Sequence, residues 1–177
     1  MGYVLVLGGA RSGKSRLADR LARQARTPVT FIATATAGDS EMAERIARHR
    51  SGRPPDWSTV EAPLELSAAI SSVVESHFLI VDCLTLWVSN LMGAGQTGEE
   101  ILGRGAEVAA LLASRRGVVV TNEVGLGIVP ANDLARAYRD LLGAVNVAFA
   151  DCAERSLLMV AGRALELSAA GPIVDLS

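Results

Sequence analysis

The sequence predicts an α/β fold, an open and mostly parallel sheet with helices on both faces. Short apolar runs alternate along the chain with segments of helical periodicity. Half of the residues are hydrophobic but only 4% are aromatic, which suits Ala-, Leu- and Val-rich helices packed on a buried sheet. The length of 177 residues is that of one ordinary domain, so we expect residues 1–177 to form a single domain.

In the first half of the chain, strands are predicted where apolar runs are short, and helices where apolar residues recur every three to four positions. The run beginning at Tyr3 ends in two glycines, and Ser40 is a suitable N-cap for a helix that must end before Pro54. The predicted elements are a strand at 3–7, a helix at 14–26, a strand at 30–33, a helix at about 41–50, a helix at 64–75 and a strand at 78–82.

The second half continues the alternation. Glycine and polar residues at 93–98 predict a loop, and a helix that ends near Arg116 follows it. A fourth strand is predicted at 117–121, a long helix at 131–153 and a fifth strand at 157–161, followed by a weakly structured tail. Since ligands of such sheets bind at the carboxyl ends of the strands, the residues directly after each strand are the candidates for function.

Composition excludes several classes of function. The net charge of −2 provides no overall basic field for nucleic acid, so we expect no nucleic-acid partner. The two cysteines, Cys83 and Cys152, form no zinc-binding or disulfide pattern. No segment reaches the roughly 20 apolar residues of a membrane span, and no leader pattern opens the chain. We therefore expect a cytoplasmic protein.

The strongest motif is a phosphate-binding P-loop between the first strand and the first helix. It consists of Gly8, Gly9, Ala10, Arg11, Ser12, Gly13, Lys14 and Ser15. The spacing G-x-x-x-x-G-K-S lets backbone N–H groups surround a phosphate at a helix N-terminus. Lys14 is the only lysine beside 16 arginines, so an ammonium group is specifically needed there. The motif predicts binding of a purine nucleoside triphosphate with Mg²⁺.

Asp82 closes the apolar strand at 78–82. In a P-loop protein, an acid at this position holds the magnesium ion or one of its waters, together with the Ser15 hydroxyl. The alternative is an ordinary strand-end residue, or a cap for a helix over 84–91. We favour Ser15 and Asp82 as the metal site.

His49 lies at the end of the helix predicted over 41–50, near four arginines. The arginines are Arg45, Arg48, Arg50 and Arg53. Their charges oppose protonation of the imidazole, and a neutral imidazole can act as a nucleophile. The residues alone leave three alternatives: a nucleotidyl or phosphoryl acceptor, a phosphate-binding arginine patch around a bystander histidine, or a histidine packed at a helix end. His77 has no such surroundings and is predicted to be structural.

A polar cluster at Thr121, Asn122 and Glu123 follows the fourth predicted strand. It could meet a substrate, order a water molecule or form an ordinary loop, and the sequence does not distinguish these roles. The guanine-specifying pattern N-K-x-D is absent from the chain. Guanine, if it is bound, must be recognised in another way.

Taken together, these segments resemble the bifunctional adenosylcobinamide kinase and adenosylcobinamide-phosphate guanylyltransferase family of cobalamin biosynthesis. The similarity covers nearly the whole chain, through GGARSGKS, ATAT, DSEMAERIARHRSGRPPDW, VDCLTLWVSNL, TNEVGLGIVP and MVAG. It implies phosphorylation of adenosylcobinamide by GTP or ATP, then transfer of GMP from GTP to give adenosylcobinamide-GDP. One departure is Gly162–Leu165, where a Gly-Leu-Pro-like run is expected.

The resemblance also implies roles for individual residues. His49 would carry the GMP as a guanylyl-histidine, with Lys14 as the second catalytic residue. Besides the P-loop, the nucleotide site would comprise Thr34, Ala35, Thr36, Arg50, Ser51, Gly52, Arg53, Glu61 and Asp82. The cofactor would be Mg²⁺, the partner a corrinoid substrate, and the assembly a homo-oligomer, with a trimer expected.

Two other functions are compatible with a P-loop. One is a kinase of another small hydroxyl substrate, in which His49 is only structural. The other is a nucleotide-dependent regulatory switch that acts through partners; the missing N-K-x-D pattern counts against it.

Overall fold

The fold was determined from a computed structural model, which describes residues 2–38 and 40–169 and, within the second helix, omits the side chains of residues 41, 42, 45, 48 and 49. The elements, in chain order, are β1 (Tyr3–Gly8), α1 (Lys14–Gln24), β2 (Val29–Ala33), α2 (Ser40–Ser51), β3 (Ser58–Glu61), α3 (Leu66–Ser72), β4 (Phe78–Asp82), α4 (Leu84–Gly93), α5 (Gly98–Ala113), β5 (Gly117–Val120), α6 (Asp133–Cys152), β6 (Arg155–Val160) and β7 (Arg163–Leu167).

The strands form one seven-stranded sheet in the order β3-β2-β4-β5-β1-β6-β7. Every neighbouring pair is parallel except β6 and β7, which pair antiparallel. The predicted open, mostly parallel sheet is therefore confirmed. Strand β5 lies between the P-loop strand β1 and the Asp82 strand β4, although it follows both in the sequence.

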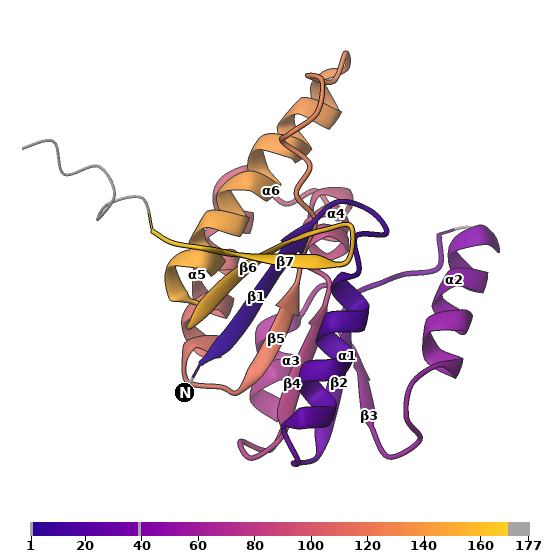
Figure 1. Cartoon of the computed structure of the whole chain (residues 1–177). Coiled ribbons are helices and arrows are strands. Elements are labelled where there is room, and N and C mark those ends of the chain that lie inside the picture. Colours follow the sequence, from indigo (N-terminus) through magenta and orange to yellow (C-terminus); the bar gives the residue numbers. More distant parts are fainter. Residues whose placement is uncertain (1, 39, 170–177) are drawn as a thin grey trace, which may run out of the picture.

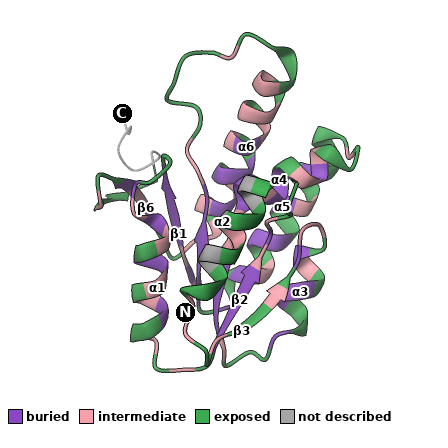
Figure 2. Ribbon diagram, turned by 90° about the vertical axis from the view of Figure 1, so that its right-hand side faces the viewer, coloured by how far each residue is buried: buried purple, intermediate pink, exposed green. Residues whose placement is uncertain are grey.

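Helices cover both faces of the sheet, as predicted (Figure 1). On one face α1 packs through Leu17, Ala18 and Ala22 on the strands. On the other face α3, α4, α5 and α6 enclose a larger core around Trp87 and Phe149. The central strands are buried on both faces, while the surfaces of α1 and α6 are exposed (Figure 2).

Two strands were not predicted. β3, at one edge, carries the residues STVE, none of which is buried. β7, at the other edge, is exposed along its whole length, and the prediction of a weakly structured tail was wrong for 163–167. Neither segment is a buried apolar run. Each forms by hydrogen bonding to a neighbour, β2 or β6.

Two helix boundaries differ from the prediction. The helix predicted over 64–75 spans only 66–72. Leu64 precedes it, and its carbonyl oxygen accepts hydrogen bonds from Trp87 Nε1 and Arg104. The loop at 93–98 ends in a capping box between Thr97 and Glu100, which fixes the start of α5.

Candidate functional site

The P-loop connects β1 to α1 through backbone conformations that favour glycine. Gly8 and Gly13 have φ angles of 147° and 100°, both in the region that L side chains rarely adopt. A Cβ on Gly8 would also collide with the carbonyl oxygen of Met159. The loop is therefore shaped by its glycines and by its contact with β6.

The turn between β6 and β7 contacts the P-loop. The backbone N–H of Gly162 donates a hydrogen bond of 2.9 Å to the carbonyl oxygen of Ser12. The Arg16 side chain also lies here, because a Cβ on Gly162 would be only 2.9 Å from its Nη2. The segment at which the sequence departs from the family pattern is thus part of the support of the P-loop.

Lys14 is buried, with 8% of its surface exposed. Its Nζ donates hydrogen bonds to the carbonyl oxygens of Gly8 (2.8 Å) and Gly9 (2.7 Å). The ammonium group is therefore held inside the curve of the loop, where a phosphate would lie.

The register of the sheet aligns two acidic residues at its carboxyl edge. Glu61 of β3 pairs with Ala33 of β2, and Ala33 pairs with Asp82 of β4. Both carboxylates consequently lie in one row at the carboxyl edge of the sheet, as expected of a doubly wound fold.

A cavity of about 470 Å³ opens at this edge. Its wall combines the P-loop helix, the ends of four strands and helix α2. The lining residues are Ser15, Phe31, Ala33, Ala35, Thr36, Ala37, Ile46, Arg50, Arg53, Glu61, Pro63, Asp82, Cys83, Thr85, Leu86 and Asn122.

A second cavity, of about 330 Å³, adjoins the first on the α1 side. It shares four lining residues with the first cavity and adds three others. The shared residues are Ser15, Phe31, Arg53 and Asp82; the additional ones are Arg16, Asp19 and Gly52. Ser15 and Asp82 thus stand where the two cavities meet.

Two side-chain contacts position Arg53 at this junction. Its guanidinium lies 3.6 Å from the ring centroid of Phe31, and its Nη1 donates to Thr59 Oγ1 at 3.2 Å. Burial lowers the pKa of Arg53, whereas the negative charge of Asp82 raises it. On the other side of the first cavity, Arg50 contacts Glu61 at 3.5 Å, an exposed pair.

Thr34 joins the ends of β2 and β4. Its hydroxyl donates to the carbonyl oxygen of Cys83 (2.7 Å) and accepts from the N–H of the same residue (2.8 Å). The fully buried Thr34 therefore fixes the backbone next to Asp82 rather than lining either cavity.

Asn90 on α4 joins the ends of β2 and β3. Its Nδ2 donates to the carbonyl oxygens of Thr34 (2.7 Å) and Pro63 (3.0 Å), and its Oδ1 accepts from Thr36 Oγ1 (3.4 Å). The Asn90 side chain thus links the segments after β2 and β3, which line the first cavity, to helix α4.

In the polar cluster after β5, Asn122 and Glu123 have different environments. The N–H of Asn122 donates to Thr85 Oγ1 at 2.8 Å, and its carbonyl oxygen accepts from Asn146 Nδ2 at 3.1 Å. Asn122 lines the first cavity, whereas Glu123 lines neither cavity and accepts from the N–H of Gly125.

His49 lies in the last turn of α2, a helix that stands apart from those covering the sheet (Figure 1). Its side chain, like those of Arg45 and Arg48, is outside the described part of the structure. The neighbouring Ile46 and Arg50 line the first cavity, which places this end of α2 beside the P-loop. His77 is elsewhere, with its Nδ1 2.9 Å from Thr30 Oγ1.

The remaining site predictions are distributed as follows. Ala35, Thr36, Arg50, Arg53, Glu61 and Asp82 line the first cavity, and Gly52 lines the second. Gly8 to Lys14 and Ser51 line neither. Sequence reasoning missed Phe31, Asn90, Arg16 and Asp19, because their roles arise from contacts between distant segments that no local motif records.

Comparison with known proteins gives a family match over most of the chain. Residues 4–167 match the model of the family described as cobinamide kinase / cobinamide phosphate guanyltransferase. The chain is 46% identical over 166 residues to the bifunctional adenosylcobalamin biosynthesis protein CobP of Pseudomonas aeruginosa, covering 92% of this chain and 95% of that protein. It is 40% identical over 174 residues to CobU of Salmonella typhimurium, covering 90% and 96%.

Similar solved structures share the fold at low identity. A Pyrococcus horikoshii protein, PH0250, superposes with a TM-score of 0.55 at 10% identity, over 93% of this chain and 85% of that one. A type III secretion system ATPase from pathogenic bacteria has a TM-score of 0.52 at 11% identity, over 89% and 50%. At these identities the likeness concerns the fold alone.

Proposed function

We propose that this chain, a member of the cobinamide kinase / cobinamide phosphate guanyltransferase family, uses its P-loop for phosphorylation and His49 on α2 for guanylyl transfer. The protein is a bifunctional enzyme of adenosylcobalamin biosynthesis. It phosphorylates adenosylcobinamide, and it then transfers GMP from GTP to that phosphate, which yields adenosylcobinamide-GDP.

In the phosphorylation step, the P-loop holds the β- and γ-phosphates of GTP or ATP. Lys14 supplies the positive charge from inside the loop, where its ammonium group already lies against the carbonyl oxygens of Gly8 and Gly9. The nucleotide occupies the first cavity, with the γ-phosphate toward Ser15 and Asp82.

Ser15 and Asp82 would hold Mg²⁺ at the junction of the two cavities. A hydroxyl and a carboxylate are oxygen ligands that suit this ion, which commonly takes one or two protein ligands and completes its shell with phosphates and waters. The fit needs no larger cluster, and the described residues contain no group of three or more His, Cys, Asp and Glu side chains that could hold a metal. When bound, the ion would neutralise charge on the phosphates.

In the second reaction, His49 is the nucleophile. A ring nitrogen attacks the α-phosphorus of GTP, the P–N bond forms, the bond to the β-phosphate oxygen breaks and pyrophosphate leaves. A phosphate oxygen of the phosphorylated corrinoid then attacks the same phosphorus, and the P–N bond breaks. Arg50 and Arg53 stabilise the charge that develops on the transferred group.

One observation carries this assignment. The end of α2 and the P-loop helix line the same cavity, through Ile46 and Arg50 on one side and Ser15 on the other. A nucleotide held by the P-loop is therefore within reach of the helix that carries His49. A kinase of another substrate, or a switch protein, would not need this arrangement.

The test is covalent labelling. The protein is incubated with Mg²⁺ and GTP labelled at the α-phosphate, with pyrophosphate removed, and is then denatured. We expect acid-labile, alkali-stable label in the wild type and in His77→Gln, and none in His49→Ala. These two are the only histidines of the chain, so His77→Gln is a matched control.

Label that persists in His49→Ala, or its complete absence from the wild type at saturating GTP, would contradict the guanylyl-histidine. The kinase assignment would be unaffected by either result, because it depends on the P-loop and not on His49.

We also propose that the enzyme acts in the cytoplasm as a homotrimer. Both cysteines are free thiols, as is usual for proteins of a reducing compartment. No described helix has the length and apolar character needed to cross a membrane. Exposed apolar side chains on the segment 124–134 support self-association; among them Ile128 is 98% exposed and Leu126 83%.

A further inference from the structure

We propose that the second cavity holds the reacting end of the corrinoid substrate, with Asp19 facing its aminopropanol hydroxyl and Arg16 and Arg53 facing the phosphate that this hydroxyl becomes. The inference rests on the proposed function, since it assumes that the nucleotide phosphates lie at Ser15 and Asp82.

The shape of the site suggests two occupants. A nucleotide in the first cavity leaves the second one open, and the two cavities meet at Ser15 and Asp82. A group bound in the second cavity would therefore lie next to the γ-phosphate without displacing the nucleoside. Direct phosphoryl transfer requires an acceptor beside the γ-phosphate.

The second cavity is also lined by residues that are close to His49 in the chain. Gly52 and Arg53, which line it, follow His49 by three and four residues along the chain. One binding place for the acceptor could thus serve both reactions, and the phosphorylated intermediate would not have to move far between them.

Asp19 is placed to act on a hydroxyl. It follows Ser15 by four residues on α1, so both side chains lie on the same face of the helix, one turn apart. In the phosphorylation step, the hydroxyl oxygen forms a bond to the γ-phosphorus, the bond to the bridging β-phosphate oxygen breaks, and the nucleoside diphosphate leaves. The Asp19 carboxylate orients the hydroxyl and accepts its proton.

Arginines on two sides of the cavity suit the product. Arg16 comes from α1, and its Nη2 lies near Gly162 in the turn between β6 and β7, whereas the Arg53 guanidinium stacks on Phe31. Guanidinium groups bind phosphate monoesters through two parallel hydrogen bonds. They would retain the new phosphate and direct one of its oxygens to the guanylyl group.

Asp19 could instead serve only to hold Arg53, since its negative charge acts on that guanidinium. This role makes a different prediction. Loss of Asp19 would then weaken every reaction that needs Arg53, including guanylylation of the protein itself.

The experiment compares three reactions in Asp19→Asn: phosphorylation of adenosylcobinamide, self-guanylylation by GTP, and GMP transfer to adenosylcobinamide phosphate supplied ready-made. We expect phosphorylation to fall on the order of 100-fold, as for loss of a positioned base, and the other two reactions to fall far less. Asp19→Glu should recover part of the phosphorylation. In Arg16→Ala, the KM for adenosylcobinamide phosphate should rise by about 10-fold or more, which corresponds to loss of a charged hydrogen bond.

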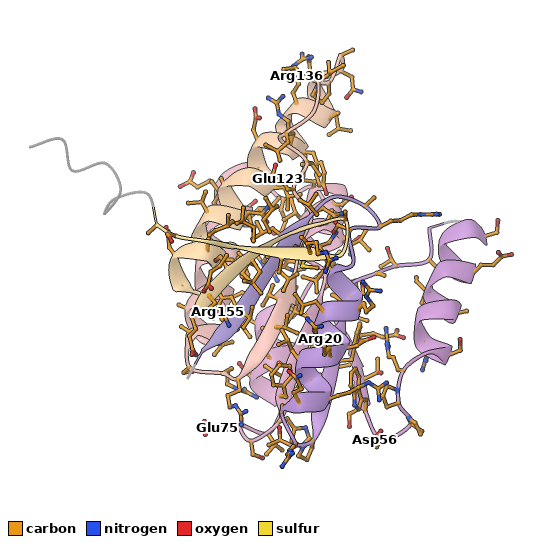
Figure 3. All side chains as sticks on the ribbon, in the orientation of Figure 1. Arg20, Asp56, Glu75, Glu123, Arg136 and Arg155 are labelled. Atoms are coloured by element: carbon orange, nitrogen blue, oxygen red, sulfur yellow. The ribbon has the colours of Figure 1, made fainter. Side chains whose placement is uncertain are left out.

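Two substitutions are matched controls. Asp56→Asn removes an exposed carboxylate from the α2–β3 connection, and Arg20→Ala removes an exposed guanidinium one turn beyond Arg16 (Figure 3). Neither residue lines a cavity, so all three reactions should remain at wild-type rates.

The inference is overturned if Asp19→Asn phosphorylates adenosylcobinamide within about 3-fold of the wild type, or if all three reactions decline together. An unchanged KM for adenosylcobinamide phosphate in Arg16→Ala would show that Arg16 does not bind the phosphate of this intermediate. Absence of self-guanylylation from the wild type would instead contradict the guanylyl-histidine, and the phosphorylation assay would still decide the role of Asp19.

Discussion

Cys83 shows how a single residue is governed by its position beside the site. It directly follows Asp82 and lines the first cavity. Burial and, next, the negative charge of Asp82 raise its pKa from 9.0 to about 11. The thiolate is therefore disfavoured, and Cys83 is suited to line the cavity as a small apolar residue rather than to act as a nucleophile.

This environment predicts slow alkylation. At pH 8, the thiolate fraction of Cys83 should be about 100-fold below that of an unperturbed thiol, so iodoacetamide should react more slowly by a similar factor. Peptide mass spectrometry can follow Cys83 separately from Cys152. In Asp82→Asn the reaction should accelerate, and a rate equal to that of a free cysteine peptide in the wild type would contradict the prediction.

The raised pKa of Cys83 also affects how the free energy of unfolding depends on pH. Below pH 9 the thiol is protonated in both the folded and the unfolded chain, so it adds no pH dependence to the free energy of unfolding. Between pH 9 and about 11 the unfolded chain loses this proton and the folded chain keeps it, so this group lowers the free energy of unfolding as the pH rises through that range.

At the scale of elements, α4 acts as a support for the site. Asn90 uses both ends of its amide, since its Nδ2 donates to Thr34 and Pro63 and its Oδ1 accepts from Thr36. The two donor bonds position strand ends whose neighbours Ala35 and Glu61 line the first cavity. A side chain that only accepts hydrogen bonds cannot replace it.

Asn90→Asp should therefore damage nucleotide binding. It removes two donors and faces a carboxylate toward two carbonyl oxygens, at a cost of about 2–3 kcal/mol. We expect the KM for GTP in self-guanylylation to rise by roughly 10-fold or more, with a smaller change in the rate at saturation. Ser89→Ala, at an exposed neighbour on α4, is the control. A normal KM in Asn90→Asp would show that other contacts hold the strand ends.

Elements differed in how well the sequence predicted them. Buried strands such as β4 have continuous apolar runs, and the P-loop has a fixed spacing, so both were predicted from local patterns. The edge strands β3 and β7 are polar or exposed, and their pairing depends on a neighbour distant in the sequence. For the same reason, a motif could indicate Ser15 and Asp82, whereas Asn90, Arg16 and Asp19 required the fold.

At the scale of the whole molecule, strand order creates the site. Because β5 lies between β1 and β4, the P-loop, Asp82 and Asn122 come from three adjacent strands. The row continues through Ala33 to Glu61. Five strands therefore deliver their carboxyl ends to one edge, and α2 approaches that edge from outside the sheet.

The same edge continues into a projecting segment. From Asn122 the chain runs outward to the N-terminal turns of α6, which extend beyond the sheet (Figure 1). Val124, Leu126, Ile128, Val129 and Leu134 expose large apolar side chains there. Such a concentration is unusual on a monomer's surface and supports the proposed contact with a second copy of this chain.

Ile128→Glu tests this proposal, because burying an unpaired carboxylate in an apolar interface costs several kcal/mol. We expect the wild type to elute as a trimer of the 18.5 kDa chain and the variant as a monomer, with the mass measured by light scattering across a dilution series. Val74→Glu, at an apolar residue 62% exposed before β4, should remain trimeric. A wild-type protein that is monomeric at every concentration would exclude self-association. If Ile128→Glu is still a trimer, the interface lies on another surface, and the exposed strand β7 is the next candidate.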